Sequence, residues 1–364
     1  MLKAGIIGIG SMGRGHLNNY IKFMEENKGI ELVAICDIRT ERMEKYPDKR
    51  HYTDFDEMLA NEEFDIIDIC LPTYLHADFA VKAMEKGINV ICEKPISLKE
   101  EDVKRVYETA EKNNVKFMVA QVLRFWPEYE LLKEIYDSKR YGKLLSGTMI
   151  RLGGYPRWSW DGWMMDEKRS GLVPFDLHIH DLDFMVYAFG MPKVAHQYRS
   201  KLPKQDFISL TYDFGDFSIN SEASWYATCY PFTAEFRFQF EDAVVSNENG
   251  KMMIYLKDDE KIDLSQQAEG DTGAINLPKS DAYANEIIYF ADCVKNNTPV
   301  EKVQPEELRC VSRTKCISGS GHRICGKDRR CHRFPSALWH HVQRCLCESC
   351  KLYVLTSVIT VIVT

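Results

Sequence analysis

Three side chains in this 364-residue sequence have the types and spacing that acid–base chemistry requires. Asp176 and His180 are four residues apart, so a helix would direct both side chains to one face. Lys94 comes much earlier, directly after an apolar segment that ends in Glu93. An imidazole can take a proton from a hydroxyl group near neutral pH, and an ammonium can stabilise the developing alkoxide. These residue types suit oxidation of a secondary alcohol, in which hydride leaves for a nicotinamide.

Two neighbours extend this hypothesis. We expect Asp176 to anchor a second substrate hydroxyl, and Asp183 to hold the His180 ring from the next helical turn. Each residue also has a structural alternative: Lys94 could be a solvated lysine at a strand end, and His180 a helix histidine with satisfied hydrogen bonds. A metal site that adds His178 is conceivable, but residues two apart on a helix face different directions. We therefore predict no metal.

A glycine-rich turn near the N-terminus predicts a dinucleotide site. Gly8-x-Gly10-x-x-Gly13 follows an apolar strand and precedes a helical pattern. Gly8 would make the tight bend, Gly10 would let a pyrophosphate approach the backbone, and Gly13 would let the helix pack on the strand. The start of the helix would offer unpaired N–H groups to the pyrophosphate.

An acidic residue follows this turn at the expected distance. Asp37 ends a second apolar segment, residues 30–36, where a carboxylate would bind the ribose hydroxyls of NAD and repel the 2′-phosphate of NADP. Arg39 softens that preference, so NADP remains possible. The alternative is a glycine-rich turn in another kind of α/β protein, with Asp37 only capping a strand.

The elements that would position these residues fall into two regions. Strand–helix alternation up to residue 122 predicts a doubly wound parallel sheet, with its ligand beyond the C-terminal strand ends. After residue 122, alternating apolar residues predict a largely antiparallel open sheet with an added helix at 175–189. We expect an amphipathic helix at 281–295 to close this second, α+β region, and the active site to lie between the two regions.

Composition narrows the class of partner. The net charge is −7, and the basic residues are concentrated after Val311, so the rest of the chain is acidic, which argues against nucleic acid. Scattered cysteines in the body predict buried free thiols in a reducing compartment. The sequence shows neither a secretory signal nor a membrane span, so we expect a cytoplasmic protein with a small-molecule substrate.

Over about residues 1–310 the chain resembles the Gfo/Idh/MocA family of dehydrogenases. The motifs that carry the resemblance are Gly8-x-Gly10-x-x-Gly13, Pro72-Thr73-x-x-His76, Glu93-Lys94-Pro95, Arg124-Phe125 and Asp176-x-x-x-His180-x-x-Asp183. The resemblance implies an NAD(P)-dependent dehydrogenase acting on a sugar, sugar derivative or cyclitol. It also implies a Rossmann domain at 1–122, a substrate-binding and oligomerisation domain at 123–310, and a homodimer or homotetramer formed through the C-terminal sheet.

The resemblance implies Lys94, Asp176 and His180 as the catalytic set. The residues expected to bind the cofactor are Gly8, Ile9, Gly10, Ser11, Met12, Gly13, Asp37, Arg39, Pro72, Thr73, His76, Glu93 and Lys94. The residues expected to bind substrate are Lys94, Arg124, Arg157, Trp163, Asp176 and His180. Arg124 could instead pair with a surface acid, and the aromatic run 155–163 could equally be core or subunit contact.

Two departures from the family pattern affect the site. His178 stands where many members have glycine, which would put a second imidazole near the pocket, and Thr73 stands where many have asparagine, at the nicotinamide. Two alternative functions remain: a catalytically silent cofactor sensor, and a glycosidase that works through a transient ketone.

Residues 311–364 do not follow the family pattern. They are basic and cysteine-rich and lack helical or strand periodicity, which predicts a non-native or disordered terminus. Cys345, Cys347 and Cys350 with His340 and His341 could bind zinc, but paired Cys-x-x-Cys motifs are missing. The apolar run at 352–364 is too short for a membrane span and would be prone to aggregation.

Overall fold

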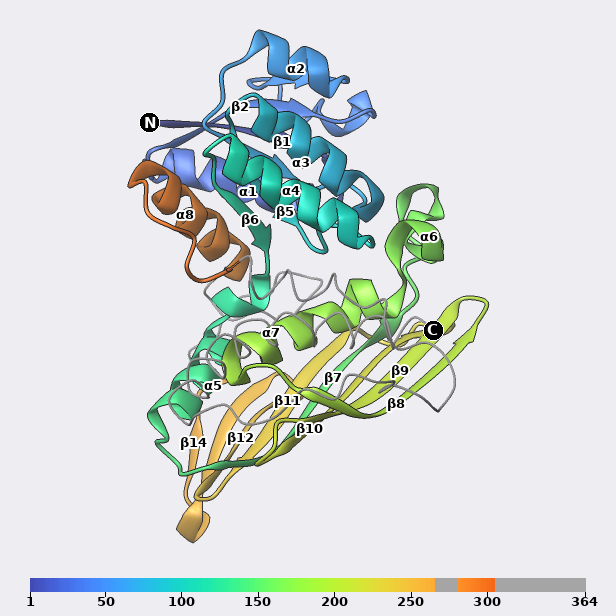
Figure 1. Ribbon diagram of the computed structural model, residues 1–364, viewed down its shortest axis with the longest axis vertical. Helices are drawn as coiled ribbons and strands as arrows, with labels where there is room; N and C mark the ends of the chain where they lie inside the picture. Colours follow the sequence, from blue (N-terminus) through green and yellow to red (C-terminus); the bar gives the residue numbers. More distant parts are fainter. Residues whose placement is uncertain (266–280, 305–364) are drawn as a thin grey trace, which may run out of the picture.

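The computed structural model describes residues 1–265 and 281–304, which form two domains (Figure 1). The predictions for residues 311–364, including the zinc alternative, lie outside the described residues. Within the described residues, no helix is long and apolar enough to cross a membrane. Four cysteines of the body are buried free thiols, as predicted, and Cys229 is exposed.

The N-terminal domain is the predicted doubly wound parallel sheet. Its strand order is β3-β2-β1-β4-β5-β6, so the order reverses at β1 and β4, where a ligand site is expected. The strands are β1 (Leu2–Ile7), β2 (Ile30–Cys36), β3 (Arg50–Tyr52), β4 (Ile66–Ile69), β5 (Asn89–Glu93) and β6 (Phe117–Ala120). The helices are α1 (Ser11–Glu25), α2 (Phe55–Asn61), α3 (His76–Glu85) and α4 (Glu100–Lys112).

Local signals in the sequence explain several of these boundaries. Asp54 caps α2 by accepting a hydrogen bond from Glu57 N at 2.8 Å. Gly87 follows α3 with a φ of 78°, the left-handed conformation that glycine adopts most easily. The Ser97-x-x-Glu100 spacing suggests a capping box at α4, which the structure lacks: the N-cap is Lys99, and Ser97 Oγ donates to Asp102 instead.

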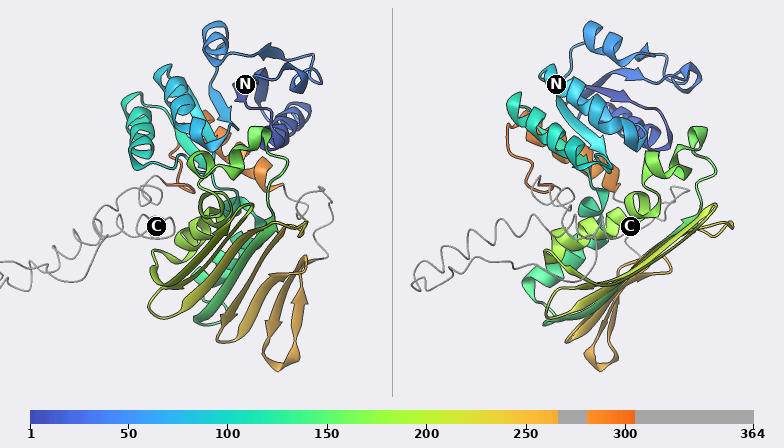
Figure 2. Two further views of the ribbon diagram at one scale, coloured as in Figure 1. Left: turned by 90° about the vertical axis from the view of Figure 1, so that its right-hand side faces the viewer. Right: turned by 45° about the vertical axis from the view of Figure 1, so that its right-hand side comes forward.

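The C-terminal domain is a mixed eight-stranded sheet, with helices between it and the first domain (Figures 1 and 2). Its order is β14-β13-β12-β11-β7-β10-β9-β8, and only the β7–β10 pair is parallel among the described pairs. The strands are β7 (Leu144–Gly154), β8 (Lys193–Leu202), β9 (Gln205–Asp213), β10 (Ser218–Tyr226), β11 (Thr233–Phe240), β12 (Ala243–Glu248), β13 (Lys251–Leu256) and β14 (Lys261–Asp263). The main helices are α5 (Pro127–Ser138), α6 (Glu167–Ser170) and α7 (Ile179–Phe189).

The predicted helix at 175–189 has two parts. Residues Pro174–His178 form a π-helical turn that continues directly into α7. A π turn holds more residues than an α turn, so it changes the direction in which neighbouring side chains project. Such turns occur often at functional sites, and this one carries Asp176.

The last described helix, α8 (Ala282–Lys295), packs on the N-terminal domain, and the prediction that it closes the second domain is wrong. Figure 1 shows α8 beside α1, and the Tyr283 ring lies 6.0 Å from the His16 ring. The amphipathic pattern identifies the buried face of a helix but not the domain that covers it. The N-terminal domain is therefore assembled from both ends of the described chain.

Candidate active site

A cavity of about 520 Å³ lies between the two domains. One end is formed by the glycine turn and Asp37, and the other by Lys94, Asp176 and His180. All residues predicted to bind the cofactor line this cavity except Ile9 and Gly13, which lie behind the turn. The strand ends of the first domain and the π turn of the second thus meet in one space.

The glycine turn has the shape that a pyrophosphate needs. Gly8 has a φ of 90°, and a Cβ on Gly13 would lie 1.8 Å from the Gly8 carbonyl oxygen. Helix α1 has no acidic residue in its first turn, and its N-cap Gly10 offers no capping side chain. The N-terminal N–H groups and the helix dipole are therefore available to an anion, and these residues fit a dinucleotide.

Asp37 is fixed on this turn by backbone groups. Its Oδ2 accepts a hydrogen bond from Ile9 N at 2.7 Å, and its Oδ1 accepts one from Arg39 N at 2.9 Å. The Arg39 guanidinium lies 5.2 Å from the centre of the Trp160 ring, which belongs to the second domain. Arg42, which sequence analysis missed, donates to Ile9 O at 2.7 Å. Two cations therefore flank the carboxylate.

Lys94 and Asp176 are in direct contact across the domain boundary. Lys94 Nζ donates to the Asp176 backbone oxygen at 2.7 Å and lies 3.4 Å from its Oδ1. Both side chains are mostly buried, with exposed fractions of 13% and 16%. This contact holds the Lys94 ammonium against the π-helical turn that carries Asp176.

His180 is held as a neutral imidazole. Burial lowers its pKa well below the ordinary value, and the positive charges of Lys94 and Arg151 lower it further. Its Nδ1 is buried and has no hydrogen-bond partner among residues 1–265 and 281–304. The ring therefore carries no charge near neutral pH and keeps one nitrogen without a proton.

Two expectations about this helix are wrong. Asp183 does not hold His180: its carboxylate pairs with Arg124, with Nη2–Oδ1 at 2.6 Å and Nε–Oδ2 at 2.8 Å. Arg124 Nη1 also donates a hydrogen bond to the Lys302 carbonyl oxygen at 2.9 Å, and Arg124 does not line the cavity. It is 1% exposed and holds the segments of Asp183 and Lys302 together, so it is not placed to reach a ligand in the cavity.

His178 and Arg157 are also placed elsewhere. His178 is fully buried between Tyr212 Oη, 2.6 Å from its Nε2, and Ser221 Oγ, 3.3 Å from its Nδ1, so it puts no second imidazole in the cavity. Burial, with Arg151, lowers its pKa to about 3. Arg157 is exposed and donates to Ala227 O at 3.0 Å. Trp163, in contrast, lines the cavity.

His76 joins two loops at the Lys94 end of the cavity. Its Nδ1 lies 2.7 Å from Pro95 O and its Nε2 lies 2.6 Å from Leu71 O. Thr73 is buried at the start of the short helix Thr73–Leu75 that precedes His76. Burial lowers the pKa of His76. This ring therefore positions the loop that carries Lys94.

A buried polar cluster behind the cavity was missed by sequence analysis. His16 Nδ1 lies 2.9 Å from Asp68 Oδ2, and His16 Nε2 lies 3.4 Å from Glu93 Oε1. Burial raises the pKa of Glu286, which faces His16 from α8 and has no hydrogen-bond partner among the described residues. His16, Asp68 and Cys70 have possible ligand atoms within 4.8 Å of one another, away from the residues weighed for a metal above.

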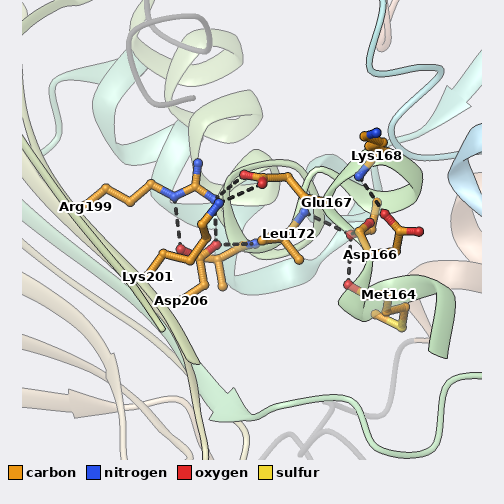
Figure 3. A network of polar contacts seen from close by, with 10 residues as sticks. Met164, Asp166, Glu167, Lys168, Leu172, Arg199, Lys201 and Asp206 are labelled. Atoms are coloured by element: carbon orange, nitrogen blue, oxygen red, sulfur yellow. Dashed lines mark hydrogen bonds and ion pairs between the residues drawn. The ribbon is translucent and has the colours of Figure 1, made fainter. Parts of the chain in front are cut away.

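A polar network anchors the segment that carries the cavity wall (Figure 3). Glu167 of α6 accepts hydrogen bonds from Lys201 Nζ at 2.6 Å and Arg199 Nη2 at 3.5 Å. Asp206 accepts from Arg199 and from Val173 N at 3.1 Å, one residue before the π turn. The β8–β9 hairpin thereby fixes the backbone from which Asp176 projects.

The two domains of this fold each match a family model. Residues 2–121 match the family model described as the oxidoreductase family with NAD-binding Rossmann fold, and residues 129–245 match the Gfo/Idh/MocA C-terminal domain. The chain belongs to the Gfo/Idh/MocA family, and its N-terminal domain is an NAD-binding Rossmann domain.

Named relatives are similar over part of their length. The chain is 28% identical over 221 residues to 2,7-anhydro-N-acetylneuraminate hydratase of Mediterraneibacter gnavus, covering 58% of this chain and 59% of the relative. It is 33% identical over 190 residues to inositol 2-dehydrogenase of Salmonella typhimurium, covering 50% and 53%. The chain therefore spans little more than half the length of these curated relatives. The structure of myo-inositol 2-dehydrogenase from Lactobacillus plantarum has the same fold, with a TM-score of 0.68 and 22% identity, covering 84% of this chain and 92% of that one.

Proposed function

We propose that this protein is an NAD(P)-dependent dehydrogenase that oxidises a secondary hydroxyl of a sugar, sugar derivative or cyclitol. The observation that supports this most strongly is that Lys94, Asp176 and His180 line the same cavity as the glycine turn. Relatives named inositol 2-dehydrogenase and D-glucoside 3-dehydrogenase support this class of substrate.

Three cavity residues would each carry out one part of the reaction. When bound, the nicotinamide supplies the hydride acceptor. His180 takes the hydroxyl proton, and because Nδ1 is buried, Nε2 is the nitrogen that accepts it. Lys94 has three N–H donors, of which Asp176 occupies two, so one remains for the substrate oxygen as it becomes negative. Asp176 orients a neighbouring hydroxyl.

A panel of inositols and sugars, assayed for NADH formation, tests the proposal. Lys94→Met and His180→Asn should each lower turnover by about 10²- to 10⁴-fold while NADH binding, followed by fluorescence, persists. His196→Asn, an exposed histidine on β8, is the matched control and should leave turnover unchanged. Near-normal rates in either cavity variant would remove these roles.

The two alternatives give different results in the same assays. NADH binding without oxidation of any panel member would favour a silent sensor. Cleavage of an aryl glycoside with only catalytic amounts of NAD would favour the transient-ketone glycosidase. The cavity position of the three catalytic candidates favours the dehydrogenase over the sensor.

We also propose assembly into a homodimer or homotetramer through the C-terminal sheet. Large apolar side chains are exposed along its strands: Leu145, Tyr198, Leu202, Tyr255 and Ile262. Such residues are typical of surfaces between subunits. Analytical ultracentrifugation tests this directly, and a monomer at micromolar concentration would contradict it.

A further inference from the structure

A group of hydrogen-bond donors lies where the cavity meets the C-terminal sheet. Arg151, Tyr129 and Asn247 line this end, and no role was expected for any of them. Arg151 is 5% exposed and lies on β7 directly opposite Ala234 of β11. Because the alanine side chain is a single methyl group, space remains in the cavity beside the guanidinium.

Asp181 neutralises Arg151 but occupies only one edge of it. Arg151 Nε lies 3.2 Å from both Asp181 carboxylate oxygens, and Nη2 donates to Oδ1 at 2.7 Å. Within residues 1–265 and 281–304, the hydrogen bonds of the Arg151 side chain all come from Nε and Nη2, and Nη1 makes none. One N–H₂ group of a permanently charged, buried side chain is therefore left for a ligand.

Tyr129 adds a second donor at the same place. Its Oη accepts a hydrogen bond from Arg151 Nη2 at 3.3 Å, so its own O–H hydrogen is directed elsewhere. Burial raises the pKa of Tyr129 well above the ordinary value, so the hydroxyl keeps its proton. The ring is fixed between Phe184 at 4.8 Å and Phe236 at 5.1 Å, which makes this donor rigid.

We propose that Arg151 and Tyr129 bind the carboxylate of the substrate, so that the alcohol oxidised belongs to a sugar acid. This inference rests on the proposed function. The Asp181 oxygens already accept hydrogen bonds from Arg151 Nε and Nη2. The donors left for a substrate group are therefore Arg151 Nη1 and the Tyr129 hydroxyl. A carboxylate suits this pair because it has two acceptor oxygens and a negative charge. A phosphate dianion would be repelled more strongly than a carboxylate by the negative charges of Asp176 and Asp181, so a singly charged carboxylate is the favoured ligand.

Matched acids and esters test the inference. D-glucuronate and D-galacturonate are compared with their methyl esters, both as substrates by NADH formation and as ligands of the protein–NADH complex by calorimetry. Charge-assisted hydrogen bonds should make the acid bind at least about tenfold more tightly than the ester.

Two variants assign the preference to these residues. Tyr129→Phe keeps the ring packing and should lower the acid-to-ester ratio about tenfold. Tyr136→Phe, on the same helix α5 but against Phe189, is the control and should keep the ratio of the unmodified protein. Arg151→Lys should also lower the ratio, once circular dichroism shows that the variant is folded.

The outcomes separate the inference from the proposed function. Acid binding that depends on Tyr129, without oxidation of any substrate, would keep the carboxylate site and remove the dehydrogenase. Oxidation of neutral sugars with no preference for acids would keep the dehydrogenase and overturn the inference. Absence of acid binding, or a preference unchanged in Tyr129→Phe and folded Arg151→Lys, would also overturn it.

Discussion

Two glycines in the first helix provide a controlled test of the dinucleotide site. A Cβ on Gly13 would lie 1.8 Å from the Gly8 carbonyl oxygen, whereas ordinary contacts begin at 3.4 Å. Relief of that clash requires α1 to move by about 1.6 Å from the turn, the difference between those distances. A Cβ on Gly15, two residues further along the same helix, would meet nothing within 4 Å.

The two alanine variants should therefore have different effects: Gly15→Ala should stabilise the fold, and Gly13→Ala should weaken NADH binding. Alanine improves helix propensity by about 1 kcal/mol at an unobstructed site, so Gly15→Ala should raise the melting temperature by about 2–4 °C. Moving the start of α1 removes charge-assisted hydrogen bonds to the pyrophosphate, each worth about 1.5–3 kcal/mol, so Gly13→Ala should weaken NADH binding by about 10- to 100-fold. Thermal unfolding and NADH fluorescence titration measure both effects. The reasoning is refuted if Gly13→Ala binds NADH within threefold of the unmodified protein, or if Gly15→Ala loses binding equally.

Three further predictions address other parts of the site. Asp37→Ala should raise KM for NAD by about tenfold, and by less for NADP, because a ribose contact is lost; an unchanged cofactor ratio in steady-state kinetics would count against this. The low pKa of His180 keeps the neutral base present below pH 6.5, so kcat/KM for oxidation should stay level until well below that pH, and Lys94→Met should move the downturn upward. Arg124→Ala leaves Asp183 buried and unpaired and should lower unfolding free energy by about 3–5 kcal/mol in denaturant titrations; a loss under about 1 kcal/mol would show the pair to be dispensable.

The parts of the fold that follow from local physical chemistry were predictable. Strand β2 spans Ile30–Cys36 as predicted, because its apolar run is bounded by a turn and by Asp37. The glycine turn was predictable because only glycine tolerates the φ of Gly8 and the close approach at Gly13. Both features depend on a few consecutive residues.

The parts that depend on distant partners were not predictable. The sequence shows no sign that Asp183 pairs with Arg124, 59 residues earlier, and not with His180 in the next turn. The π turn rotates His178 into the core, a change that an α-helical spacing cannot indicate. Arg151 gave a weak signal, as a charged residue inside an apolar strand, and such a residue is buried only with a partner or a role.

The position of α8 has a consequence for how the protein is synthesised. When the ribosome has released β6, all six strands of the parallel sheet exist, but α8, which brings Tyr283 and Glu286 against His16, has not been translated. The surface of the first domain around His16 therefore stays exposed to solvent while the whole second sheet is synthesised. Its final closure comes only when the returning helix arrives, so the domain made first is the one completed last.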